Sequence, residues 1–301
     1  MKKIISFFVL AFIALMPLHA DQYRDALKKY LTSSDVVSIE QIQQMAQSIL
    51  MQQGADQNEI SKLISEYVGS QMMDDMVDLF LPYFQKYVSM EDLKKLTKTQ
   101  QQKRYSQLMS QTTATMQDLA QNTEYQQLAE QLGEGMKAIL EGKEPQLIPM
   151  VESITNSYQQ IFDRYFDVSG TKKSMESVFS SFGDLIVSAL GDDQQTNVDS
   201  IYSDYVTYTS ESLRNMMLNI FSKVYSEKDL NYLTKKMDNT AYTHCVSATN
   251  EAGADLMLIS VDFLEKMGDW TMANHPEFEK TVNNLREYVT IVKSQLLHQN
   301  Q

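Results

Sequence analysis

Apolar side chains recur every three or four residues through most of the chain after residue 38. One such stripe, from Ile39 to Leu50, fits one face of a helix. Ser38 with Gln41 forms a capping-box start for that helix, and Gly54 suits its end. A second stripe comprises Ile60, Leu63, Ile64, Tyr67, Met72, Met73, Met76, Phe80, Phe84 and Tyr87, and Ser89 follows as the next expected N-cap. No segment alternates convincingly with a period of two, so the pattern predicts an all-α fold.

The first twenty residues have a different pattern from the rest of the chain. Lys2 and Lys3 precede an apolar run from Ile4 to Met16, and the small residue Ala20 comes shortly after it. This order is typical of a secretory signal peptide, here with cleavage after Ala20. The run is shorter than the roughly 20 residues that span a bilayer. We therefore expect a mature chain in the periplasm or secreted, with no transmembrane segment.

The chain also contains an internal match at a spacing of 137 residues. The stretch from Phe84 to Leu119 is identical to that from Phe221 to Leu256 at 13 of 36 positions without a gap. The identical pairs include Ser89/Ser226, Asp92/Asp229, Leu93/Leu230, Leu96/Leu233 and Tyr105/Tyr242. The match predicts two tandem, internally duplicated helical-bundle units at 36–170 and 171–301, after a lead segment at 21–35. Each is long enough to form its own core.

The two matched stretches resemble a known family. In Phe84–Leu96 and in Phe221–Leu233, an apolar helix end is followed by a short link, acidic residues and a Leu-x-x-Leu pair. This resembles the signature of exported bacterial proteins called domain of unknown function 2059. The family's usual Phe-Tyr-x-Ser/Thr-Pro-x-Gly stretch is replaced by 99–101 and 236–238, which contain neither Pro nor Gly. The resemblance implies an α-helical protein outside the cytoplasm and carries over no catalytic residue.

Composition narrows the possible partners. The formal net charge is −13, so we expect no nucleic-acid binding, because a chain this acidic is repelled by the phosphate backbone. With 10 Gly and 5 Pro in 301 residues, turn residues are too scarce for an all-β fold. Cys245 is the single cysteine, which excludes an internal disulfide, so packing must provide the stability.

Two pairs of residues deserve comparison with known chemistry. His244 and Cys245 are adjacent, and adjacent helical residues point about 100° apart, so they do not form a base–nucleophile pair. Cys245 also matches Leu108 in the repeat, which predicts a buried packing role. Asp74 and Asp78 lie one helical turn apart, with Glu211 and Asn215 as counterparts. Two such oxygen ligands are too few for calcium, so a solvated helix face is the simpler interpretation.

The other candidate motifs also favour structural roles. Asp192–Asn197 lacks the alternating acids, central Gly and final Glu of a calcium loop. His275 and His298 are isolated, and the sequence has no His-Glu-x-x-His, nucleophile elbow or phosphate-binding Gly loop. Trp270 has no counterpart in the first copy, and we expect it to be structural. We therefore assign no catalytic, cofactor-binding or metal-binding residue, and no cofactor.

The helical stripes are rich in Met and Phe. Met76, Phe80 and Phe84 recur as Met216, Met217 and Phe221 in the second copy. Met residues are ordinary core filler, and they also form surfaces that adapt to partners. We expect these residues to belong to the core.

Together, these observations favour a non-enzymatic binding, scaffold or envelope-homeostasis protein whose partner is a protein or a small apolar ligand. Two alternatives stay open: a carboxylate-dependent envelope hydrolase with a site between the two units, and a carrier of an apolar ligand in a Met-lined cavity. A cleft with convergent Asp or Glu would indicate the hydrolase, and an enclosed apolar cavity would indicate the carrier.

Overall fold

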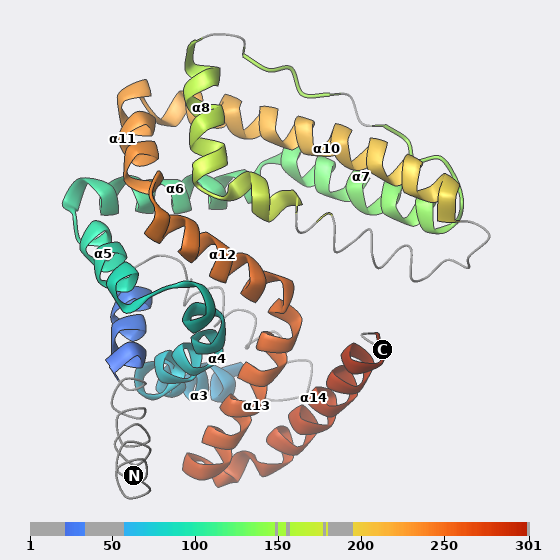
Figure 1. Cartoon of the computed structure of the whole chain (residues 1–301). Coiled ribbons are helices and arrows are strands. Elements are labelled where there is room, and N and C mark those ends of the chain that lie inside the picture. The colour runs from blue at the N-terminus through green and yellow to red at the C-terminus, as the bar shows by residue number, and fades with distance from the viewer. Residues whose placement is uncertain are drawn as a thin grey trace, which may run out of the picture. The chain divides into compact units, whose positions relative to one another are not determined.

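The computed structural model describes residues 22–33, 57–147, 150–154, 157–176, 179 and 195–299 (Figure 1). These ranges are almost entirely helical and contain no strand, so the all-α prediction is confirmed. None of their helices is long and apolar enough to cross a membrane. The helix predicted between Ser38 and Gly54 lies outside the described residues, and so does the predicted signal peptide.

The chain folds into two compact units, one of which is formed by two separate segments of the sequence. The first unit joins Met1–Gln101 with Ser247–Gln301, and the second unit is Gln102–Val246. These bounds differ from those of the predicted tandem copies at 36–170 and 171–301. The reason is that each unit takes helices from both halves of the sequence. The duplication itself stays a prediction.

The described part of the first unit is a bundle of helices from both ends of the chain. It contains the lead helix (residues 22–33), α3 (Gln57–Ser70), α4 (Met72–Tyr87), α5 (Met90–Gln100), α13 (Leu256–Asn274), the short η1 (Pro276–Phe278) and α14 (Glu279–Gln299). Helix α14 packs along α13, and α13 packs on α3 and α4. The core between them holds Leu63, Tyr67, Met76, Phe263, Met267 and Leu285.

The second unit is built around one long helix. It contains α6 (Lys103–Gln121), α7 (Thr123–Leu140), α8 (Ser157–Val168), α10 (Gln195–Val224), α11 (Glu227–Met237) and the first part of α12 (Thr240–Ala254). Helix α7 lies beside α10, and α8 packs on α11 (Figure 1). The core is formed by Tyr105, Leu108, Phe162, Met216, Met217, Phe221 and Leu230. The expectation that the Met and Phe stripes form core is confirmed in both units.

Two matching serines begin α5 and α11. The Ser89 hydroxyl accepts a hydrogen bond from the Asp92 amide at 3.1 Å, and the Ser226 hydroxyl accepts one from the Asp229 amide at 3.2 Å. Each serine thereby satisfies one of the free N–H groups at a helix start. The predicted N-cap at Ser89 is confirmed, with a full capping box.

A short aromatic helix packs on a matched phenylalanine in each unit. In the first unit the lead helix buries Leu27, Tyr30 and Leu31, and the Tyr30 ring lies 6.0 Å from Phe84. In the second unit α8 buries Phe162, Tyr165 and Phe166, and the Phe162 ring lies 5.5 Å from Phe221. The lead helix is therefore part of the core of its unit.

We predict that Leu27→Ala lowers the free energy of unfolding by about 2–4 kcal/mol, because Leu27 is 0% exposed and its removal leaves a cavity. The matched control is Lys29→Ala, which changes an exposed position on the same helix and should stay within about 0.5 kcal/mol of the wild type. Urea unfolding followed by circular dichroism measures both. Equal stability of the two variants would show that the lead helix does not contribute to the core.

Candidate functional site

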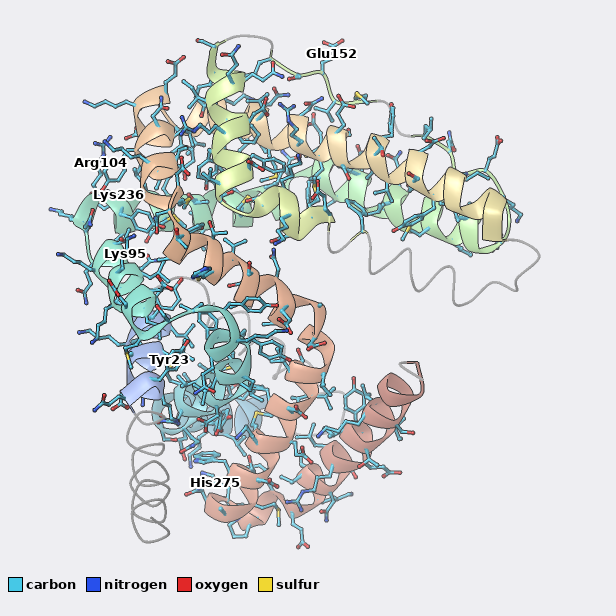
Figure 2. All side chains as sticks on the ribbon, in the orientation of Figure 1. Tyr23, Lys95, Arg104, Glu152, Lys236 and His275 are labelled. Carbon is cyan, nitrogen blue, oxygen red and sulfur yellow. The ribbon has the colours of Figure 1, made fainter. Side chains whose placement is uncertain are left out.

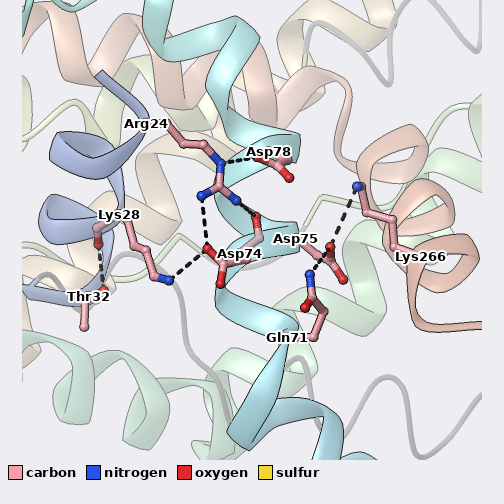
Figure 3. Close-up of polar contacts among 8 residues, drawn as sticks. All are labelled: Arg24, Lys28, Thr32, Gln71, Asp74, Asp75, Asp78 and Lys266. Atoms are coloured by element: carbon pink, nitrogen blue, oxygen red, sulfur yellow. Dashed lines mark hydrogen bonds and ion pairs between the residues drawn. The ribbon is translucent and has the colours of Figure 1, made fainter. Parts of the chain in front are cut away.

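The acidic pair Asp74 and Asp78 holds the lead helix in place (Figure 3). Arg24 Nε lies 2.7 Å from Asp78 Oδ1, and Lys28 Nζ lies 2.8 Å from Asp74 Oδ1. The hydrogen bond from Lys28 lowers the pKa of the Asp74 carboxyl below its ordinary value, against the opposing effect of burial. Both carboxylates are partly exposed, as on a solvated helix face, and they also form ion pairs with the lead helix that the sequence did not predict.

The neighbouring Asp75 points to the other side of α4 and is buried (Figure 3). Its carboxylate accepts a hydrogen bond from the Tyr67 hydroxyl at 2.7 Å and one from Gln71 Nε2 at 3.2 Å, and Lys266 Nζ lies 3.8 Å away. Burial and this bond raise the pKa of the Tyr67 hydroxyl above its ordinary value. The Tyr67 ring in turn packs 5.3 Å from Trp270. This cluster ties α3, α4 and α13 together.

We predict that Lys28→Ala destabilises the protein by about 0.5–1 kcal/mol at neutral pH, as expected for a partly exposed ion pair. Because the pKa of Asp74 is lowered in the folded state, its contribution is present above the ordinary pKa of about 4 and is lost as the pH falls through the lowered value. The stability gap between wild type and variant should therefore close on acidification. The exposed Lys62→Ala is the control. A gap that persists at the lowest pH would mean that Lys28 acts through packing.

The remaining histidine and cysteine candidates have structural surroundings. Cys245 is buried, so the prediction of a packing role is supported by its position. His275 Nε2 lies 2.9 Å from Glu66, and its Nδ1 lies 3.3 Å from Glu277. In the described ranges no three His, Cys, Asp or Glu side chains are arranged to hold a metal ion. The His298 side chain and the first part of Asp192–Asn197 lie outside those ranges.

The feature that helical patterning does not explain is the connection between α7 and α8. Helix α7 ends at Leu140, and Gly142 follows with a φ of +70° that suits glycine. The Gly142 and Lys143 amides donate to the carbonyls of Ile139 and Ala138. Pro145 follows and cannot continue the helix. Of the chain that follows, residues 143–147 and 150–154 are described, and neither range is helical (Figure 1). We call residues 150–154 of this connection the strap.

Three polar side chains of α10 bind the backbone of the strap. The Val151 amide donates to Ser212 Oγ at 3.2 Å, and Asn215 Nδ2 donates to the Val151 carbonyl at 3.0 Å. Asn219 Nδ2 donates to the Glu152 carbonyl at 2.9 Å. Ser212, Asn215 and Asn219 are three and four residues apart, so they form one stripe on the helix. Both backbone groups of Val151 are thereby satisfied by side chains.

The side chains of the strap are divided between the core and the solvent. Val151 and Ile154 pack against the core of the second unit. Glu152 is exposed and points away from α10 (Figure 2). Asn219 Oδ1 is buried beside the strap and has no hydrogen-bond partner in the described structure. A buried acceptor without a partner is costly and uncommon in folded proteins.

The first unit has no such stripe at the matching positions. A spacing of 137 places Asp75, Asp78 and Pro82 opposite Ser212, Asn215 and Asn219. Asp78 pairs with Arg24, and proline has no side-chain donor. Among these matching positions, only those on α10 bind a non-helical backbone through side chains, and we take this stripe as the candidate site.

The stripe of Ser212, Asn215 and Asn219 was not predicted from the sequence. Asn215 was considered only as the counterpart of Asp78 in a cation pair, whereas its amide donates to Val151 and its Oδ1 accepts from Arg214 Nη1 at 2.7 Å. One signal was present: Ser212 and Asn215 interrupt the apolar positions on the buried side of a helix. Buried polar side chains of this kind require a partner.

Comparison with known proteins gives no match: no protein-family model, curated protein or solved structure is similar to this chain. The resemblance to domain of unknown function 2059 stays a prediction.

Proposed function

We propose that the protein is a non-enzymatic binding protein of the bacterial envelope that holds an extended segment of a partner polypeptide on α10. The observation that carries the proposal is the set of hydrogen bonds from Ser212, Asn215 and Asn219 to the backbone of the strap. Hydrogen bonds to a main chain provide affinity that depends little on sequence, and pockets for side chains add specificity.

Two further observations support binding over catalysis. Asp74 and Asp78, the acidic pair singled out in the sequence, form ion pairs with the lead helix. Cys245 is buried among core residues, which suits a packing role. The signal peptide expected at residues 1–20 supports a role outside the cytoplasm.

Photo-crosslinking in the native host tests this function. A photoreactive phenylalanine analogue replaces the exposed Glu211, next to Ser212 on α10, and in a control it replaces the exposed Glu287 on α14. We predict an adduct of recurring mass from position 211, none from position 287, and loss of the adduct when Asn215→Ala is added. That loss is expected because Asn215 would no longer bind the partner's main chain.

Adducts that are equally frequent at both positions, or that persist undiminished with Asn215→Ala, would contradict the proposed function. Circular dichroism of the Asn215→Ala protein provides the control for folding. N-terminal sequencing of the same cell fractions shows whether the exported form begins at Asp21.

A further inference from the structure

We propose that the strap is an internal ligand that closes the α10 site, and that a partner binds by replacing it. This inference rests on the proposed function, and it adds how the site is regulated and which class of ligand it takes. The strap would be an autoinhibitory segment, and the ligand would be an extended stretch of another polypeptide.

The strap satisfies the site incompletely. Its backbone forms hydrogen bonds with the side chains of Ser212 and Asn215. From the Asn219 side chain it accepts a hydrogen bond from Nδ2 only and makes none with Oδ1. The buried Asn219 Oδ1 lacks a donor in the described structure. A ligand whose backbone N–H reached this oxygen would form a bond that the strap does not form. Such a ligand would gain affinity over the strap, since a buried acceptor without a partner is penalised.

The strap also indicates the chemistry of the ligand. Its two apolar side chains, Val151 and Ile154, are three residues apart and face the core, while Glu152 between them is exposed. We therefore infer an extended segment with aliphatic residues at its first and fourth positions and a free choice at the second. Helix α10 would read such a segment chiefly through its main chain.

Release of the strap does not require either flanking helix to unfold. Helix α7 is closed by its own bonds from Gly142 and Lys143 to Ile139 and Ala138. Helix α8 is held by Phe162, Tyr165 and Phe166, which are buried in the core. The strap thus lies in the sequence between two helices that are anchored independently of it, which is the arrangement that a displaceable segment needs.

A peptide-binding measurement on the full mature chain tests this proposal. The probe is a fluorescein-labelled synthetic peptide with the sequence of residues 146–157, followed by fluorescence anisotropy. In the released variant, Val151→Asp and Ile154→Asp place charges where the strap meets the core, which disfavours docking of the strap. The matched control is Glu152→Gln, which changes an exposed strap residue.

We expect the released variant to bind the peptide roughly 10–100-fold more tightly than the wild type, because a site that is mostly occupied has a proportionally lower apparent affinity. Glu152→Gln should behave as the wild type. Adding Asn215→Ala to the released variant should abolish binding, and so should a peptide with Asp at the position of Val151.

The other outcomes overturn one claim or both. Equal binding by wild type and released variant would overturn the autoinhibitory role of the strap and leave the proposed function standing. No binding by a folded released variant would overturn both.

If that variant does not fold, wild-type protein is incubated with excess peptide carrying a photoreactive leucine at the position of Val151. Crosslinks mapped to α10 near Asn215 support the proposal, and crosslinks elsewhere, or none, overturn it.

Discussion

The packing of a short aromatic helix on one phenylalanine is the interaction on which each unit depends. In the first unit, Tyr30 of the lead helix packs on Phe84 near the end of α4. In the second unit, Phe162 of α8 packs on Phe221 near the end of α10. With no disulfide available, apolar burial at these two points must hold each short helix in place. Two partly exposed ion pairs, Lys28–Asp74 in the first unit and Arg214–Asp163 in the second, make a smaller contribution to the stability.

A second constraint explains the candidate site. A chain that leaves a helix must find new partners for its N–H and C=O groups, because unpaired backbone groups are costly when buried. In the strap, Ser212, Asn215 and Asn219 supply those partners from side chains of α10. The second unit thus contains a helical surface that binds a non-helical backbone, and this binding supports the proposed function in polypeptide binding.

The sequence predicted well what depends on local pattern. The all-α class, the N-cap at Ser89, the core role of the Met and Phe stripes, and the burial of Cys245 all follow from helical spacing or capping chemistry. The docking of the lead helix could also have been predicted, because Leu27, Tyr30 and Leu31 lie three and four residues apart.

What could not be predicted depends on contacts between distant segments. The partners of Asp75 come from α3 and α13, and the partners of Val151 lie more than 60 residues along the chain. The composition of each unit from both halves of the sequence is a long-range property of the same kind. Pro145 is a residue that cannot continue a helix, but it does not indicate which helix binds the chain that follows.

Amide hydrogen exchange of the unmodified mature protein tests most directly whether the strap leaves its site in the folded state. The informative amide is that of Val151, which donates to Ser212, compared with the amides of Asn215 to Leu218 within α10. We predict that the Val151 amide exchanges through a local opening, about 100-fold or more faster than the α10 amides. If the Val151 amide exchanged only at the rate of the α10 amides, through global unfolding, the strap would be a fixed part of the core that a partner could not displace from the folded protein.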